Sequence, residues 1–243
     1  MFEIIDDLKT KLDHHRPLPL AIVKNLHEYL LLRWIYHSNA IEGNTLTLLE
    51  TKVVLEGITV GGKVLREHFE VINHRDAILY VEDIIKKEEP FSEWQIRNIN
   101  QLILKNIDDE NAGRYRQQNV LISGATNNPP DHTLLNDKMA QFIDWYNTEA
   151  FNLHSVERAA KVHADFVGIH PFVDGNGRTS RLIMNLELMK AGYPPSVITV
   201  ENRLAYYEAL DQWMAYGNTE LFINLIAGVV LDGFKPYQMV LGI

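Results

Sequence analysis

The sequence HPFVDGNGRTSR, residues 170–181, carries more reactive side chains and more backbone freedom than any other stretch of this chain. It brings one imidazole, one carboxylate, two glycines and two guanidinium groups together. Beyond it, apolar residues recur at helical spacing, at Leu182, Ile183, Leu186 and Met189. This pattern predicts a loop that leads into the N-terminus of a buried helix. Such a helix start binds anions, and phosphate in particular.

Two arginines, Arg178 and Arg181, are three residues apart and should share one face of this helix. Positive charge is unfavourable in the first turn, because that end of the helix dipole is already positive. A di- or triphosphate would offset both charges. Gly175 and Gly177 let the backbone approach a ligand and turn its N–H groups inward. We therefore predict a nucleotide site, although the chain contains no P-loop sequence.

His170 and Asp174 each allow two interpretations. A lone histidine after an apolar helix is usually a core residue, but beside a phosphate site His170 could act as a general base. Asp174 could cap the following helix. It could equally hold Mg²⁺ or Mn²⁺, because magnesium favours one or two carboxylates together with phosphate oxygens.

The composition narrows the class of protein. Hydrophobic residues make up 46% of the 243 residues, enough for a sizeable core. The net charge of −9 argues against a general nucleic-acid-binding surface, and the absence of cysteine excludes thiolate zinc sites. We see neither a signal peptide at the N-terminus nor an apolar stretch of the ~20 residues that span a bilayer. The expected setting is cytoplasmic, without nucleic-acid or membrane partners.

Helical spacing dominates the rest of the chain. Helices are predicted over 20–41, from 47, over 64–87, 92–106, 134–148 and 154–169, up to 190, and over 201–214 and 218–232. Thr47 and Ser92 each open a capping-box pattern. The run Val120-Leu121-Ile122 instead predicts one arm of a small β-hairpin. The predicted fold is all-α with this one hairpin, and we divide it into an N-terminal helical region (1–107), a core (108–232) and a tail (233–243).

Residues 170–181 match, without a departure, the signature of Fic-domain proteins, His-Pro-Phe-x-Asp/Glu-Gly-Asn-Gly-Arg-x-x-Arg. The chain resembles that family from about Tyr36 to Ala227. It is most similar to the class that includes the endoplasmic-reticulum-type Fic AMP transferases and bacterial relatives. The resemblance implies the Fic fold, a helical bundle with a β-hairpin flap over the active site. It also implies protein adenylyltransferase activity, in which AMP moves from ATP to a Ser, Thr or Tyr hydroxyl of a target protein.

The resemblance implies a role for each matched position. His170 would deprotonate the hydroxyl that attacks the α-phosphate, and Asp174 would hold the Mg²⁺ that bridges the α- and β-phosphates. Arg178 would bind the β-phosphate side and Arg181 the γ-phosphate. The remaining residues would complete the anion hole and the ATP-binding segment: Gly175, Asn176, Gly177, Thr179 and Ser180.

Two further segments resemble parts of the ATP site. The flap would cover the nucleotide and align a target segment by main-chain pairing, with four residues nearest ATP: Ile122, Ser123, Gly124 and Ala125. Tyr206 and Tyr207 occupy the place of a tyrosine pair beside the adenine, although core packing explains them equally well. Close relatives place an asparagine against the nucleotide where this chain has Met214-Ala215, which puts that contact in doubt.

The segment Ser38-Asn39-Ala40-Ile41-Glu42-Gly43 fits the inhibitory motif of the family, Ser/Thr-x-x-x-Glu-Gly/Asn. A glutamate at the C-terminus of a helix opposes the helix dipole by ~0.3–1 kcal/mol, which favours a functional reason for Glu42. The resemblance implies that Glu42 pairs with Arg181 and displaces the γ-phosphate, and that Ser38 tethers the helix of Glu42, which ends at Gly43. It also implies that Glu42 could align a water for removing AMP from the target.

Other interpretations stay open. Some Fic relatives transfer UMP, phosphocholine or phosphate, and a catalytically silent nucleotide-binding module is a third alternative. The complete glycine-arginine motif favours ATP, and an intact His170 argues against the silent module. The sequence names no target protein and leaves the oligomeric state open. A homodimer is suggested only by the relatives that dimerise.

Overall fold

The computed structural model describes residues 1–242 and is helical throughout, with no β-strand in that range. Three short 3₁₀ turns, at His132–Leu134, Ala150–Asn152 and Val200–Asn202, interrupt the connections. The α-helices are α1 (Phe2–His14), α2 (Leu20–Ile41), α3 (Leu48–Leu55), α4 (Leu65–Lys86), α5 (Glu93–Leu104), α6 (Leu135–Thr148), α7 (Ser155–Ile169), α8 (Asn176–Lys190), α9 (Arg203–Tyr216) and α10 (Glu220–Leu241). The predicted all-α class is confirmed.

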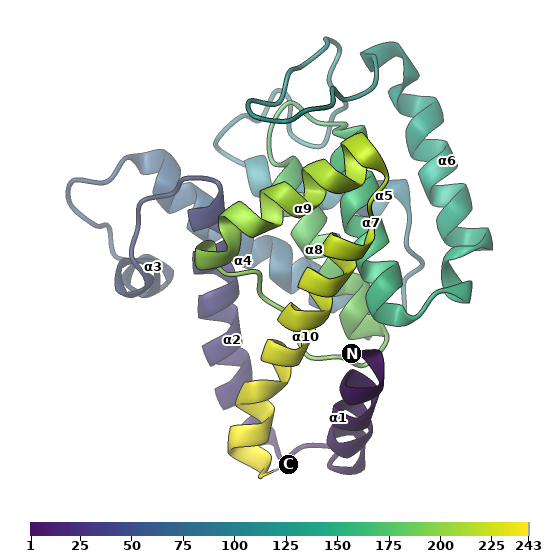
Figure 1. Ribbon diagram of the computed structural model, residues 1–243. Coiled ribbons are helices and arrows are strands. Elements are labelled where there is room, and N and C mark those ends of the chain that lie inside the picture. The colour runs from purple at the N-terminus through teal and green to yellow at the C-terminus, as the bar shows by residue number, and fades with distance from the viewer. Residues whose placement is uncertain (243) are drawn as a thin grey trace.

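Helices α7 and α8 form the centre of the molecule (Figure 1). Helices α9 and α10 cover them in front in this view, and α4 and α5 lie behind. Two apolar clusters meet at the central pair. One contains Phe166 of α7 and Leu182 of α8, and the other contains Ala160 of α7 and Met184 of α8. The loop that joins α7 to α8 is the 170–175 part of the signature, so the most buried helices of the fold position it.

The capping box predicted at Thr47 is confirmed. Glu50 N–H donates to Thr47 Oγ1 at 3.2 Å, and Thr47 N–H donates to Glu50 Oε2 at 2.7 Å. The capping box predicted at Ser92 is wrong. Ser92 Oγ donates to Gln95 Oε1 at 2.6 Å, and Gln95 Nε2 donates to Glu89 Oε2 at 3.2 Å, so the two side chains bind polar partners other than the backbone.

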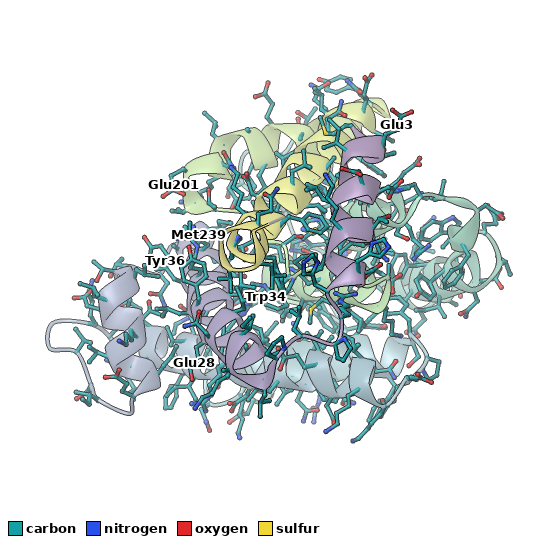
Figure 2. The ribbon with its side chains drawn as sticks, turned by 90° about the horizontal axis from the view of Figure 1, so that it is seen from below. Glu3, Glu28, Trp34, Tyr36, Glu201 and Met239 are labelled. Atoms are coloured by element: carbon teal, nitrogen blue, oxygen red, sulfur yellow. The ribbon has the colours of Figure 1, made fainter. Side chains whose placement is uncertain are left out.

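Helix α10 continues beyond the end predicted near residue 232. It runs to Leu241 although Pro236, which removes a helix hydrogen bond, lies inside it. Burial explains the continuation, because Phe234 is fully buried and Tyr237 packs against the same apolar cluster. Figure 2 shows the C-terminal part of α10, marked by Met239, beside α2, marked by Glu28 and Trp34. The last residue of the predicted tail, 243, lies outside the described residues.

No helix within residues 1–242 is long and apolar enough to cross a bilayer.

The predicted β-hairpin is wrong, because residues 120–125 form turns and irregular loop. The segment lies at the top of Figure 1, between α5 and α6. Its only internal backbone hydrogen bond is a turn, from Ala125 N–H to Ile122 O at 3.2 Å. A strand needs a partner for its N–H and C=O groups, and no neighbouring segment of the described chain offers one. Within the run Val120–Ile122, Leu121 is therefore 83% accessible, while Val120 and Ile122 are partly buried.

Candidate active site

His170 follows α7 and has a left-handed backbone, with φ 49° and ψ 58°. This conformation costs a non-glycine residue about 1–2 kcal/mol, but Pro171 disfavours continuation of the helix at the residue before it. Arg116 stabilises the turn: its Nε donates to His170 O at 2.9 Å, and its backbone N–H donates to Pro171 O at 2.9 Å. Burial lowers the pKa of His170 to about 4, so the imidazole is neutral near pH 7 and able to accept a proton.

Asn176 closes the loop that follows. Its Oδ1 accepts from Phe172 N–H at 3.0 Å and its Nδ2 donates to Phe172 O at 2.8 Å, while the Phe172 ring is fully buried. Gly175 adopts φ 79°, and a Cβ there would lie 2.9 Å from Asn100 Nδ2. The asparagine of the signature thus braces the loop with its side chain. The predicted anion hole consists of the backbone at the start of α8.

Asp174 lies at the edge of this loop between two arginines. Its Oδ1 accepts from Gly175 N–H at 2.5 Å and from Arg178 Nη2 at 3.1 Å, and its Oδ2 accepts from Arg66 Nη2 at 2.6 Å. Burial alone would raise the pKa of Asp174, but Arg178, the Gly175 N–H and Arg66 outweigh it and hold the pKa below its ordinary value. The cap residue of α8 is Gly175, so Asp174 is not the helix cap.

Arg181 binds the C-terminal end of α2. Its Nη2 donates to Glu42 Oε1 at 2.7 Å and to Ser38 O at 2.9 Å, and its Nε donates to Ser38 Oγ at 3.0 Å. The guanidinium is buried, and that burial would lower its pKa, but the charge of Glu42 and the hydroxyl of Tyr206 raise it instead. Ser38 and Glu42 of the inhibitory motif therefore both contact the last arginine of the signature, 139 and more residues away.

The Glu42 carboxylate also lies against the first turn of α8. A Cβ placed on Gly177 would overlap Glu42 Oε1, so glycine at this position allows the close approach. Gly43, with φ 98°, turns the chain away immediately after Glu42. The carboxylate therefore occupies the helix N-terminus at which an anion is most strongly attracted.

Tyr206 is buried behind Arg181. Its hydroxyl oxygen accepts from Arg181 Nη1 at 3.3 Å and lies 3.1 Å from His163 Nε2. Ser180 Oγ lies 3.0 Å from the same His163 nitrogen and donates to Gly177 O at 2.7 Å. Tyr207 is half-exposed, and its hydroxyl donates to Ile41 O at 3.2 Å, at the end of α2.

Of the other predicted ATP-binding residues, Thr179 lies inside α8 and Ile122 lies outside the signature loop. Thr179 is fully buried and its N–H donates to Gly175 O at 2.9 Å. Ile122 lines a cavity of about 580 Å³ between the flap segment and α6, α7 and α9, together with Trp145, Trp213 and Met214. Ser123 and Gly124 lie in an exposed turn, which the hydrogen bond from Ala125 N–H to Ile122 O closes.

Sequence reasoning missed the residues that reach the site from other helices: Arg66 and Glu70 of α4, Asn100 of α5, His163 of α7, and Arg116. Arg116 is the most connected of them, because its side chain also donates to Gln118 O at 2.9 Å and Pro130 O at 2.6 Å. The only sequence signal for Arg116 was its position between the helix predicted over 92–106 and the strand predicted at 120–122. The others lie among ordinary helical residues, and nothing in their local pattern distinguishes them.

These observations define an all-helical protein in which the chain's own Glu42 carboxylate binds Arg181 and lies against the N-terminal turn of α8. Residues 90–188 match the Fic/DOC family. A Fic domain containing signaling protein from Bacteroides thetaiotaomicron is 30% identical, with a TM-score of 0.86 and coverage of 96% of both chains. The chain therefore belongs to the Fic/DOC family.

Two further relatives extend the comparison. Fic-1 from C. elegans has a TM-score of 0.89 at 30% identity, covering 99% of this chain and 71% of the other. The protein adenylyltransferase Fic of Nematostella vectensis is 39% identical over 93% of this chain and 53% of its own length. The chain spans about half the length of the curated relatives it matches.

Proposed function

We propose that this protein is a protein adenylyltransferase that transfers AMP from ATP to a Ser, Thr or Tyr hydroxyl, and that Glu42 inhibits it. The observation that carries the proposal is the position of the Glu42 carboxylate, 2.7 Å from Arg181 and in contact with Gly177 at the start of α8. An anion site that a carboxylate already fills would accept a phosphate once that carboxylate leaves. The names of the curated relatives, protein adenylyltransferases, agree with this assignment.

The residues of the loop divide the chemistry among them. Neutral His170 takes the proton from the target hydroxyl, whose oxygen attacks the α-phosphorus of ATP. The bond from that phosphorus to the bridging oxygen of pyrophosphate breaks, and pyrophosphate leaves with its electron pair. The N–H groups at the start of α8 neutralise charge on the phosphates, with Arg178 on the β-phosphate side and Arg181 at the γ-phosphate. The rate gain comes mainly from positioning and charge neutralisation.

Asp174 is the residue that would hold a divalent cation. A Mg²⁺ or Mn²⁺ ion fits its surroundings, because magnesium needs only one or two carboxylates when phosphate oxygens complete its shell. No cluster of three or more His, Asp or Glu side chains suited to a metal occurs within residues 1–242, which agrees with a cation that arrives with the nucleotide. When bound, the cation would offset phosphate charge during the transfer.

A labelling assay with different donors tests the proposal. The Glu42→Gly variant is incubated with Mg²⁺ and ATP labelled at the α- or the γ-phosphate, or with UTP labelled at the α-phosphate. We expect protein-bound label from α-labelled ATP alone. Label from the γ-position would indicate phosphate transfer, and label from UTP would indicate a uridylyl donor. Absence of both labelling and ATP binding would overturn the transferase assignment.

Removal of AMP is a second activity that the position of Glu42 favours. Glu42 Oε1 binds Arg181, but the Glu42 side chain is 32% exposed. Water can therefore reach the carboxylate beside the proposed anion site. Glu42 could then orient a water toward the phosphorus of an AMP-modified hydroxyl. Wild-type protein should release AMP from a labelled target and Glu42→Gly should not. Equal release by both would exclude this role.

The exposed segment Val120–Ala125 is the surface on which we expect the target to dock. Its backbone groups lack a strand partner, and an extended target segment would provide one. Arg116 binds backbone carbonyls on either side of this segment, Gln118 O and Pro130 O. Measuring the mass of the protein in solution would show whether it forms a homodimer.

A further inference from the structure

Arg66 reaches the proposed cation-binding carboxylate from a different helix. It lies in the first turn of α4, and its Nη2 donates to Asp174 Oδ2 at 2.6 Å, across 108 residues of sequence. Its Nε donates to Glu70 Oε1 at 3.1 Å, one turn further along the same helix. Arg66 lies outside the signature at residues 170–181, and the packing of α4 against α8 brings it to Asp174.

With this contact, both oxygens of Asp174 accept at least one hydrogen bond. Oδ1 already accepts from Gly175 N–H and from Arg178, and Oδ2 accepts from Arg66. A divalent cation binds a carboxylate through oxygen lone pairs that are not directed at N–H donors. A cation that binds Oδ2 would meet the charge and the N–H group of Arg66, so Arg66 and the cation compete for this oxygen.

Of the two arginines, only Arg66 is free to move. The Arg66 side chain is 54% exposed, whereas the Arg178 side chain is 3% exposed. Glu70 would keep the charge of Arg66 paired after the move, because its own position is fixed by Asn44 Nδ2 at 2.9 Å from Oε2. Arg66 can thus pivot on Glu70 at little cost, and Arg178 cannot leave the core.

We infer that Arg66 is a positioning residue that neutralises Asp174 when no cation is present and gives way when a divalent cation binds with the nucleotide. Arg66 thereby lowers the metal dependence of nucleotide binding. Without Arg66, the Asp174 carboxylate would be paired only with Arg178 and the Gly175 N–H group, and it would repel phosphate more in the absence of metal and attract the cation more strongly in its presence. The inference rests on the proposed nucleotide-binding function.

Calorimetry of the non-hydrolysable analogue AMP-PNP tests the inference in the Glu42→Gly background. The quantity measured is the ratio of Kd in EDTA to Kd in Mn²⁺, which reports the coupling between metal and nucleotide. Loss of an exposed ion pair changes an equilibrium by up to about fivefold, so Arg66→Ala should raise the ratio by roughly fivefold. Arg66→Lys, which keeps the charge, should stay within about twofold of the parent.

Two controls make each outcome decisive. Arg75→Ala removes another half-exposed arginine of α4, whose partner is Asp76 at 2.8 Å, and should leave the ratio unchanged. Asp174→Ala should reduce the ratio to about one. If Asp174→Ala has that effect and Arg66→Ala equals the parent, the inference is wrong while the proposed function stands. If no variant binds AMP-PNP under any condition, the proposed function and the inference are both wrong.

Discussion

Replacing Glu42 with glycine should free the anion site and tighten binding of nucleotides that carry a γ-phosphate. In the wild type the carboxylate competes with that phosphate for Arg181, so only the fraction of molecules with Glu42 displaced can bind productively. The apparent Kd is the intrinsic Kd divided by that fraction. AMP lacks the γ-phosphate and should gain much less.

The size of the effect follows from the contact. A hydrogen bond to a charged group contributes ~1.5–3 kcal/mol, and the 32% exposure of the Glu42 side chain places this one at the weak end. Because ~1.4 kcal/mol corresponds to a factor of ten, AMP-PNP should bind about tenfold more tightly to Glu42→Gly. The lost contact should also lower the Tm by roughly 3–6 °C in a domain of this size.

Titration calorimetry with AMP-PNP and with AMP measures both affinities, and the chain offers a matched control. Glu56 ends α3 immediately before Gly57, as Glu42 ends α2 before Gly43, but its nearest cation is Lys52 at 3.9 Å in solvent. Glu56→Gly should change neither affinity by more than about twofold, because Glu56 pairs with Lys52 of α3 and shares no partner with the site. An equal gain for AMP and AMP-PNP, or no gain in Glu42→Gly, would refute competition at Arg181.

Three further predictions follow from the site. Gly177→Ala should destabilise the wild type by about 1–3 kcal/mol in urea denaturation, because its Cβ overlaps Glu42, and should cost nothing in the Glu42→Gly background; equal costs would contradict this. Arg116→Ala removes three donated bonds to backbone carbonyls and should cost about 2–4 kcal/mol and speed limited proteolysis within residues 117–131. The pKa of His170, lowered by burial to about 4, implies that the base form is lost only as pH falls toward 4. The kcat/KM of Glu42→Gly should therefore stay level from pH 8 to 6, and an inflection near 6.5 would contradict it.

The helices could be predicted from sequence because local patterns encode them, and the anion site at the start of α8 stays a prediction. Thr47 and Glu50 are close in sequence, and the apolar spacing of α7 and α8 marks them as central. The contact between Glu42 and Arg181 was expected only from a resemblance, since nothing local joins residues 139 positions apart. Their roles in inhibition and in phosphate binding stay predictions until the affinities are measured.

The errors have physical causes that the sequence does not display. Val120–Ile122 has strand propensity, but a strand forms only with a partner, and residues 1–242 supply none. Pro236 resembles a helix end, yet burial of Phe234 keeps α10 intact beyond it. Arg66 could not have been found at all, because its meaning depends on the packing of α4 against α8.

One site should both transfer AMP and be blocked by Glu42, and intact-protein mass spectrometry after incubation with ATP and Mg²⁺ measures this directly. We predict that Glu42→Gly gains the mass of AMP, that the wild type gains far less, and that Glu42→Gly combined with His170→Ala gains none. Equal modification of the wild type and Glu42→Gly would contradict inhibition by Glu42. Modification that survives the loss of His170 would contradict the assignment of the base.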